Sequence, residues 1–326
     1  MLKIANFDLG FADECYSLNP KKYGGGSVLG RHCKQLDNFH LFAPAKSFEN
    51  LNNLDRKENC FILSDKICHA LKNGYPIDLV FPDINKYDLI LHGHTNFSFN
   101  RTNRLEIPVI HWSGFGGDAG HSFNNYILLY RKCFNACYGE KAKYVTIGKD
   151  VPKEFKEFNE RDGIFQATQH CNDFGSIDIA KECIKHGIKG IFAGPIRDYP
   201  LLDYIDNKNT FYVGILSEED KLNYTKKAKL YTLPLKWEVA FNQSAIEAGG
   251  LGTPILATKR GWFNEYIKDG INGFFYDQTN FLECYRKSDR IDQRLCWESA
   301  REFSIENMVN SFYQAFNEIK NEWIYK

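Results

Sequence analysis

The chain has 326 residues, of which 43% are hydrophobic and 25% charged, a composition ordinary for a globular protein and long enough for two domains. The 41 Lys and Arg residues balance 41 Asp and Glu residues, so no global field drives the chain onto nucleic acid or anionic lipid. Its 10 cysteines include no Cys-x-x-Cys pair, which favours a reduced compartment over a disulfide framework or a zinc site.

Apolar runs alternate with helical stretches along the chain, which predicts parallel sheets flanked by helices. In the first half, the expected strands are Leu2–Leu9, Phe39–Ala43, Asp78–Phe81, Asp88–His92, Pro108–Trp112 and Tyr144–Ile147. Helices are expected at Gly24–Leu36 and at Phe123–Tyr138. The charged segment Lys149–Arg161, which contains Pro152, is predicted to connect two lobes.

The same pattern restarts after this connector. The expected strands are Gly163–Ala167, Gly190–Ala193, Phe211–Val213, Ala228–Thr232 and Ile255–Ala257. The expected helices are Ser176–His186, Glu218–Lys227, a short helix ending at Gly252, and Ser299–Trp323, whose apolar residues recur at helical spacing.

The repetition of this pattern predicts two doubly wound, Rossmann-like α/β lobes, residues 1–150 and 151–304, with a cleft between them. Ligands bind beyond the carboxyl ends of the strands in such lobes. Residues 305–326 are expected to form a C-terminal helix that packs back toward the N-terminal lobe.

The sequence predicts neither a membrane span nor a secretion signal. No apolar run approaches the ~20 residues that a helix needs to cross a bilayer. The first strand is too short and too polar for a signal peptide. The expected location is therefore cytoplasmic, either soluble or peripheral to the membrane.

The most informative segment of the chain is 236–277. Two carboxylates, Glu238 and Glu247, stand just before and just inside its short predicted helix. The N–H groups of a helix start attract anions such as phosphate, and a buried carboxylate needs hydroxyl partners. The segment therefore predicts a site for a phosphorylated, hydroxyl-rich ligand. The alternatives are that Glu247 only caps its own helix and that Glu238 is a solvated loop charge.

This segment resembles the signature of the retaining GT-B glycosyltransferases of family 4, also called group 1. That signature has a first Glu, a Phe-Gly pair, a second Glu followed by Ala, a Gly-x-Pro strand and a glycine-rich acidic segment. The matching residues are Glu238, Phe241, Glu247-Ala248, Gly252-Thr253-Pro254-Ile255, Gly261, Glu265, Asp269-Gly270 and Gly273. Residues 191–195 and 211–214 resemble two further motifs of the family. The resemblance covers nearly all of the second half and the first half only loosely.

The resemblance implies transfer of a sugar from a nucleotide-diphosphate sugar to a glycan, lipid-linked sugar or other acceptor. It implies retention of the anomeric configuration, and no metal or other cofactor. Glu238 would face the transferred sugar and Glu247 would accept from the ribose hydroxyls. The backbone of Phe241, Asn242 and Gln243 would donate N–H groups to the sugar and the diphosphate.

The chain departs from the family at two basic residues that usually meet the diphosphate after the first strand of the second lobe. Gln169 and Phe174 occupy those positions. The leaving-group charge must still be stabilised. The candidates are Arg197, Lys236, Lys259, Arg260 and, if it is protonated, His170. Glu238 and Glu247 are also separated by one residue more than in the family.

The first half carries a glycine loop at Gly24, Gly25 and Gly26, which resembles the family's loop between first strand and first helix. Glycines let the backbone approach a ligand closely, although a flexible turn is the alternative. The loop lacks the G-x-G-x-x-G spacing, so bound NAD is not expected.

Histidines stand at expected strand ends. By resemblance, His111 matches a family histidine that touches the donor sugar, and His94 is the second candidate. Structural histidines are the alternative. The pair His92 and His94 suggests a metal, but no Asp, Glu or Cys pattern supports one.

Other functions compatible with these observations are a nucleotide-sugar epimerase or phosphorylase on the same fold, and a non-catalytic nucleotide-sugar-binding protein with a decayed site. Glycosylation of nucleic acid is opposed by the neutral charge balance. The expected partners are a nucleotide-sugar donor and a glycan or lipid-linked acceptor, with possible peripheral membrane contact.

Overall fold

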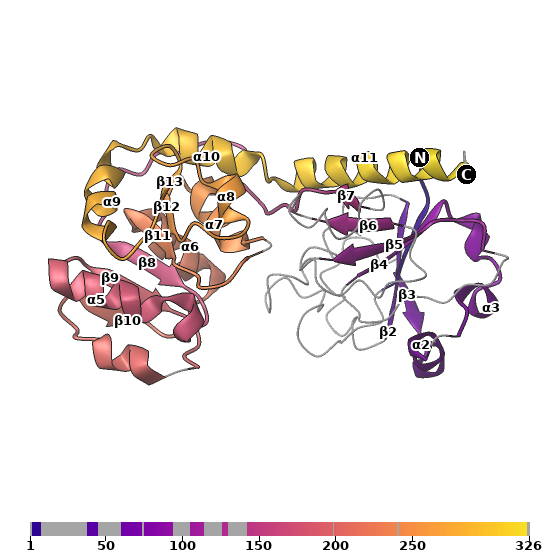
Figure 1. Cartoon of the computed structure of the whole chain (residues 1–326), viewed down its shortest axis with the longest axis horizontal. Coiled ribbons are helices and arrows are strands. Elements are labelled where there is room, and N and C mark those ends of the chain that lie inside the picture. Colours follow the sequence, from indigo (N-terminus) through magenta and orange to yellow (C-terminus); the bar gives the residue numbers. More distant parts are fainter. Residues whose placement is uncertain are drawn as a thin grey trace. The chain divides into compact units, whose positions relative to one another are not determined.

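A computed structural model describes residues 2–7, 38–44, 60–73, 75–93, 105–113, 126–129, 142–197, 199–239 and 241–324. The chain forms two compact units, which Figure 1 shows. Unit 1 consists of Met1–Gly148 and Ile305–Lys326, and unit 2 is Lys149–Ser304. Within the described ranges, no helix is both long and apolar enough to cross a membrane.

The described residues of unit 1 contain a seven-stranded parallel sheet. Its strands are β1 (Ile4–Phe7), β2 (Phe39–Pro44), β3 (Cys60–Leu63), β4 (Leu89–Gly93), β5 (Val109–Ser113), β6 (Tyr126–Leu129) and β7 (Ala142–Tyr144). They lie in the order β3-β2-β1-β4-β5-β6-β7, which is a doubly wound arrangement. The described helical elements of unit 1 are α2 (Asp65–Lys72), α3 (Ile77–Val80), η4 (Ile84–Lys86) and α11 (Ile305–Ile324).

Helix α11 returns to unit 1 at the end of the chain and runs along it beside β7 (Figure 1). The indole of Trp323 donates to the Glu106 carbonyl at 2.7 Å. The ammonium of Lys320 lies 2.6 Å from the Asp88 carboxylate. The buried residues of α11 recur at helical spacing and include Met308, Phe312, Phe316 and Ile319. This apolar face explains why the helix packs on unit 1.

Unit 2 contains a six-stranded parallel sheet with the order β10-β9-β8-β11-β12-β13. The strands are β8 (Ile164–Ala167), β9 (Gly190–Ala193), β10 (Thr210–Tyr212), β11 (Leu230–Leu233), β12 (Ile255–Ala257) and β13 (Gly273–Phe275). The helices are α5 (Ser176–His186), α6 (Glu218–Lys227), α7 (Gln243–Gly250), α8 (Phe263–Tyr266), α9 (Phe281–Lys287) and α10 (Gln293–Arg301), with η7 (Asn172–Phe174), η8 (Tyr199–Tyr204) and η9 (Ser288–Arg290).

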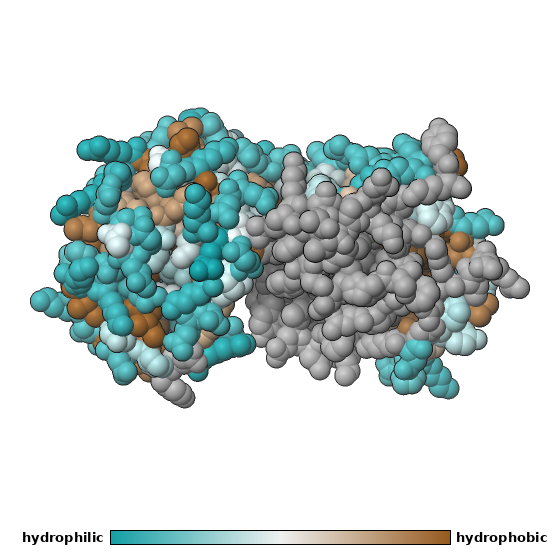
Figure 2. Space-filling model, viewed as in Figure 1, coloured by the Kyte–Doolittle hydropathy of each residue, from teal (hydrophilic) through white to brown (hydrophobic). Residues whose placement is uncertain are grey.

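The central strands of the unit 2 sheet are buried on both faces. Every residue of β11 and β12 is buried, as expected for central strands of a parallel sheet between helices. The face of unit 2 seen in Figure 2 is mainly hydrophilic, with separate hydrophobic patches. Both units thus repeat one doubly wound plan, and the predicted fold class of two Rossmann-like lobes is confirmed.

Two expected elements of unit 1 are wrong in type. The expected strand Asp78–Phe81 is the short helix α3, which begins after Pro76 and carries Asp78 in its first turn. An acidic residue in the first turn favours a helix start. The expected helix Phe123–Tyr138 contains strand β6, which pairs with β5 and β7. A short apolar run fits a strand inside a parallel sheet as well as it fits a helix, and periodicity alone does not separate the two.

Several expected bounds differ from the structure; for example, the expected strand Ala228–Thr232 is β11, which runs from Leu230 to Leu233. The expected closing helix, from Ser299 onward, is two helices: α10 ends at Arg301 and α11 begins at Ile305, where the chain leaves unit 2. The expected strand Tyr144–Ile147 overlaps β7 only at Tyr144. Helix α7 ends at Gly250, two residues before the expected Gly252, which has a positive φ of 72°. The expected helix Gly24–Leu36 lies outside the described residues.

Candidate active site

The turn between β8 and α5 contains the positions where the sequence lacks the expected basic pair. Gly175 ends this turn with φ 65°, and a Cβ there would lie 2.5 Å from the Pro234 carbonyl oxygen. Only glycine fits this close approach without strain. The Gln166 amide donates to the Phe174 carbonyl at 3.1 Å and so fixes the turn to the sheet.

His170 is buried in this turn and is neutral. Its Nε2 lies 2.9 Å from the Ala193 carbonyl oxygen, which can only accept. Nδ1 therefore accepts from the Ser176 hydroxyl at 2.8 Å. Burial lowers the pKa of His170 to about 4. The candidate role of a protonated His170 as a cation for the diphosphate is therefore wrong, because the buried imidazole cannot carry charge near neutral pH.

Two cationic residues are attached to the same turn. The N–H of Arg197 donates to the His170 carbonyl at 2.9 Å, and the N–H of Lys236 donates to the Asp173 carbonyl at 2.9 Å. Both side chains are exposed. The Lys236 ammonium lies 3.2 Å from the carboxylate of Asp178, in the first turn of α5. Two of the four remaining candidate cations therefore lie at the turn that carries Gln169 and Phe174.

The other two candidate cations follow strand β12. Lys259 and Arg260 are both exposed, and the Lys259 ammonium lies 5.4 Å from the centre of the Phe275 ring. The structure records no contact between either residue and the turn between β8 and α5 within the described part of the chain.

Glu247 is a buried carboxylate held between two lysines. One oxygen pairs with Lys149, and the other lies 2.9 Å from the ammonium of Lys221. Lys221 also pairs with Glu218 of the same helix at 2.8 Å. Burial alone would raise the pKa of Glu247, but the charges of Lys149 and Lys221 outweigh it, so the pKa is lowered. Glu247 is therefore ionised at neutral pH.

Asn242, and not Glu247, caps the N-terminus of helix α7. The Asn242 side-chain oxygen accepts from the Ala245 N–H at 3.0 Å. Glu247 is the fifth residue of the helix, beyond reach of the N-terminal donors. The alternative in which Glu247 caps its own helix is therefore wrong. Gln243, at the first helical position, carries a buried side-chain oxygen without a hydrogen-bond partner in the described structure.

Glu238 lies in the loop before α7 and is bound to a second part of the signature. Its carboxylate accepts a hydrogen bond from the N–H of Gly261. The neighbouring Val239 carbonyl accepts from the N–H of Trp262 at 2.7 Å. Glu238 is exposed, yet its carboxylate is oriented by this backbone donor. The loop 236–239 and the segment around Gly261 are thus held together.

The side chain of Phe241 belongs to the core of unit 2. Its ring packs against Trp262 with centroids 4.8 Å apart, and it also contacts Phe303. The ring is half-buried in these contacts, and the expected role of the Phe241 backbone N–H stays a prediction.

The first-half candidates are described only in part. His111 lies in β5 opposite His92 of β4, and His92 is 1% exposed. The side chain of His111, together with His94, Gly24, Gly25 and Gly26, lies outside the described residues. In the part of the chain that is described, no group of three or more His, Cys, Asp or Glu side chains is placed to hold a metal ion.

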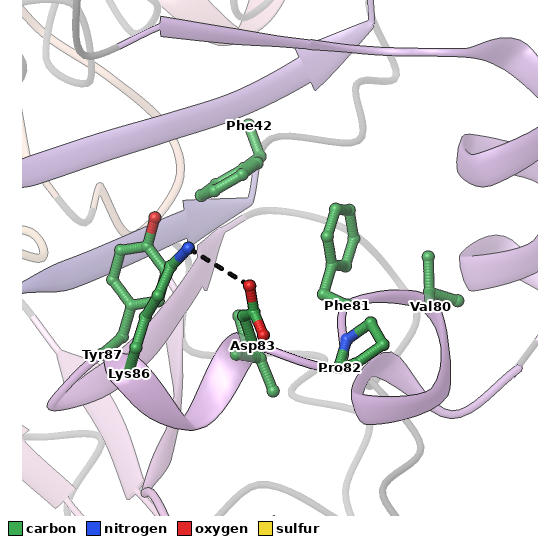
Figure 3. Close-up of a pocket in the computed structure, with 8 residues that line it drawn as sticks. Phe42, Val80, Phe81, Pro82, Asp83, Lys86 and Tyr87 are labelled. Carbon is green, nitrogen blue, oxygen red and sulfur yellow. Dashed lines mark ion pairs between the residues drawn. The ribbon is translucent and has the colours of Figure 1, made fainter.

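Unit 1 contains a pocket of about 250 Å³, shown in Figure 3. It is lined by Phe42, Val80, Phe81, Pro82, Asp83, Ile84, Lys86 and Tyr87. The Lys86 ammonium lies 3.8 Å from the Asp83 carboxylate, and this exposed ion pair is drawn dashed in the figure. The pocket is smaller than most small-molecule sites, and no residue of the predicted site lines it.

A family comparison bears on the segment that contains the two carboxylates. Residues 199–291 match the family model of the glycosyl transferases group 1. A protein of 41.2 kDa from the cps region of Klebsiella pneumoniae, itself uncharacterized, is 26% identical over 129 residues. The match covers 36% of this chain and 35% of that protein, so the chain spans about a third of that relative's length.

Solved structures share the fold over the whole chain. AviGT4, a glycosyltransferase involved in avilamycin A biosynthesis, has a TM-score of 0.70 and 14% identity over 98% of each chain. Sucrose-phosphate synthase of Thermosynechococcus elongatus has a TM-score of 0.72 and 11% identity, over 98% of this chain and 99% of that one. Anabaena HepE (Alr3699), solved with UDP and glucose, has a TM-score of 0.65 and 14% identity over 98% of this chain and 100% of its own.

The fold is that of the GT-B glycosyltransferases. Residues 199–291 are also similar in sequence to the group 1 family.

Sequence reasoning missed the two lysines that surround Glu247. Lys221 follows Glu218 at the i, i+3 spacing, a pattern that predicts a solvated helix face. Lys149 stands in a charged segment that resembles an ordinary connector. Neither pattern signals a contact with a residue so distant in the sequence.

Proposed function

We propose that this protein transfers a sugar from a nucleotide-diphosphate sugar to an acceptor, with retention of configuration and without a metal, and that unit 2 binds the donor. The observation that carries the proposal is the burial and ionisation of Glu247. This residue is a buried, ionised carboxylate inside the segment that matches the group 1 family, and an ionised carboxylate is an acceptor only. Such a group suits the hydroxyls of a ribose.

The donor's diphosphate needs positive charge, because its negative charge grows as the sugar departs. Arg197 and Lys236 flank the turn between β8 and α5 and keep their side chains exposed. We assign them the role of the basic pair that Gln169 and Phe174 do not provide. The backbone of Phe241, Asn242 and Gln243 donates further N–H groups to the diphosphate.

In the proposed reaction, the bond between the anomeric carbon and the phosphate oxygen breaks, and the acceptor oxygen attacks the same face. The departing phosphate oxygen takes the acceptor proton. Glu238 and His111 orient the sugar, and catalysis comes from positioning and charge stabilisation. HepE, which shares the fold over the full chain, was solved with UDP and glucose, and this supports a nucleotide-sugar donor.

The test begins with a thermal-shift panel of nucleoside diphosphates and nucleotide sugars, since selective binding raises the melting temperature by mass action. Analysis of products with the selected donor then separates transfer from epimerisation, phosphorolysis and binding without turnover. Glu247→Ala is expected to abolish donor binding, whereas Glu238→Ala lowers turnover and keeps nucleotide binding. Glu219→Ala, an exposed carboxylate of α6, is the matched control. Unchanged binding and turnover in both site variants contradicts the proposal.

A further inference from the structure

Two lysines from separate elements pair with the carboxylate of Glu247. Lys149 is the first residue of unit 2, Lys221 belongs to α6, and Glu247 to α7. Their side chains are 14%, 22% and 7% exposed, respectively. One lysine pairs with each carboxylate oxygen, so neither oxygen carries both cations.

Both lysines are anchored before any ligand arrives. The Lys149 N–H donates to the Phe303 carbonyl at 2.9 Å, and Lys149 forms a β-bridge with Ser304. This anchor lies where the chain enters and leaves unit 2. Lys221 is held in α6 by its N–H, which donates to the Ser217 carbonyl at 2.9 Å, and by its ion pair with Glu218. With these backbones held, each ammonium group pairs with one carboxylate oxygen, and the two ion pairs together orient the carboxylate.

A carboxylate has about four lone-pair directions, two on each oxygen. Each lysine occupies one lone-pair direction of one carboxylate oxygen, so one acceptor direction remains on each oxygen. Two adjacent hydroxyl donors match that arrangement, and the 2′ and 3′ hydroxyls of a ribose are such a pair. A 2′-deoxyribose offers one donor and leaves one lone pair of a buried carboxylate unsatisfied, which is costly.

The lysines also set the charge state of this acceptor. The titratable groups that face Glu247 are Lys149, Lys221, Tyr231 of β11 and, through Lys221, Glu218. Burial raises the pKa of Tyr231 to about 12, so its hydroxyl is neutral. Without a lysine, the effect of burial on Glu247 is no longer outweighed, and the carboxyl group takes a proton at higher pH. A protonated carboxyl has lost an acceptor and gained a donor.

We propose that Lys149 and Lys221 are positioning residues that hold the Glu247 carboxylate in one orientation, and that the preference of this site for ribose over 2′-deoxyribose depends on both lysines. This inference rests on the proposed function, because it takes unit 2 as the donor-binding unit.

The experiment compares matched pairs of nucleoside diphosphates by calorimetry: UDP with 2′-deoxy-UDP, and likewise for GDP, ADP and CDP. For the base that binds, the wild-type protein is expected to prefer the ribonucleotide by roughly 10- to 100-fold, as for loss of one hydrogen bond to a charged group. This preference is expected to be equal at pH 5.5 and pH 7.5. Equal affinity for the two members of the pair overturns the inference and leaves the proposed function standing.

Variants then assign the preference to the lysines. Lys221→Met is expected to reduce the preference to within roughly threefold at pH 5.5 and to restore part of it at pH 7.5, where Glu247 ionises again. Lys149→Met behaves in the same way, and Lys221→Arg restores the wild-type profile. Lys227→Met, an exposed lysine of the same helix, is the control and leaves both affinities unchanged.

The outcomes separate the two proposals. If no nucleoside diphosphate binds the wild-type protein, the proposed function fails. If the ribonucleotide is preferred but both Met variants keep a pH-independent preference, the lysines do not position Glu247 and the inference is overturned. A urea titration of each variant confirms that it is folded. The comparison of nucleotides on the wild-type protein tests the inference even where a variant does not fold.

Discussion

Unit 2 arranges its polar groups in opposite ways at two places. Around Glu247, a buried carboxylate is paired with two half-buried lysines. In the turn between β8 and α5, the buried groups are neutral, as His170 and Ser176 show, and the cations Arg197 and Lys236 remain exposed. The first place has its charges compensated before a ligand arrives. In the second, the cationic side chains are exposed to solvent and the buried side chains beside them are neutral.

The difference matters because buried and exposed charges respond differently to a ligand. A buried pair that loses one partner leaves an uncompensated charge and is strongly destabilised. An exposed pair such as Lys236 with Asp178 contributes about 0–1 kcal/mol and is easily exchanged for a better partner. The Glu247 cluster therefore suits neutral hydroxyl groups, whereas the turn suits an anionic group. The donor of the proposed function carries both kinds of group, hydroxyls on its ribose and an anionic diphosphate.

The largest expected effect comes from removing the buried charge. Glu247→Gln is expected to lower the free energy of unfolding by about 3 kcal/mol at pH 7, because Lys149 and Lys221 lose their counter-charge. Urea denaturation at pH 7 measures this difference. Glu219→Gln, at an exposed position of α6, is expected to change the free energy of unfolding by less than about 0.5 kcal/mol. If the two variants are equally stable, the charges around Glu247 are not compensated in the way described, and the contrast with the turn between β8 and α5 is wrong.

The same variant gives a pH test with a definite sign. The pKa of Glu247 is lowered from its ordinary 4.5, so its charge stabilises the folded state fully above that value. The stabilisation is lost as the pH falls through the folded-state pKa. The difference between wild type and Glu247→Gln is therefore expected to stay constant from pH 7 to pH 5 and to shrink below pH 4.5. A difference that instead grows in acid contradicts the assignment.

The sequence predicts the elements of unit 2 well where local signals are complete. Helix α6 has its expected bounds because Ser217 caps it, acidic residues fill its first turn, and Lys226 and Lys227 end it. The elements that the sequence predicts wrongly are short. Helix α3 and strand β6 have four residues each, and their type is set by pairing and packing with distant parts of unit 1. Local propensity is too weak to decide such cases.

In the candidate site, too, the sequence identifies some residues but not the contacts that the tertiary fold creates. The signature directs attention to Glu247 and Glu238, and the proximity of Glu238 to Gly261 links two parts of the signature. The partners of Glu247 could not be predicted, because Lys149 and Lys221 reach it only through the tertiary fold. The charge of His170 could not be predicted either, because a motif position does not reveal burial. The roles of the glycine loop and of His111 remain predictions.

A smaller effect is expected from the exposed cations. The double variant Arg197→Ala/Lys236→Ala is expected to weaken binding of the selected nucleoside diphosphate by roughly 10- to 100-fold, because two contacts to the anion are lost. The free energy of unfolding is expected to be nearly unchanged, since neither side chain is buried. Calorimetry and urea titration measure the two quantities. Lys208→Ala/Arg290→Ala, at exposed positions elsewhere in unit 2, is the matched control. An unaffected affinity shows that the diphosphate binds elsewhere.

The smallest expected effect tests whether His170, which is buried in the turn between β8 and α5, is neutral in the folded protein. The pKa of His170 is lowered from 6.5 to about 4 in the folded state. As the pH falls below 6.5, the unfolded chain takes up a proton that the folded protein does not, so stability decreases.

Between pH 7 and pH 5, this linkage is expected to cost about 1–2 kcal/mol, and the loss should be absent in His170→Gln. Urea titrations of the two proteins at several pH values give the difference between them, in which the contributions of the other histidines cancel. A wild-type protein that gains stability relative to His170→Gln as the pH falls would mean that His170 is charged when folded. The turn would then hold a buried cation of its own, and the contrast with the Glu247 cluster would disappear.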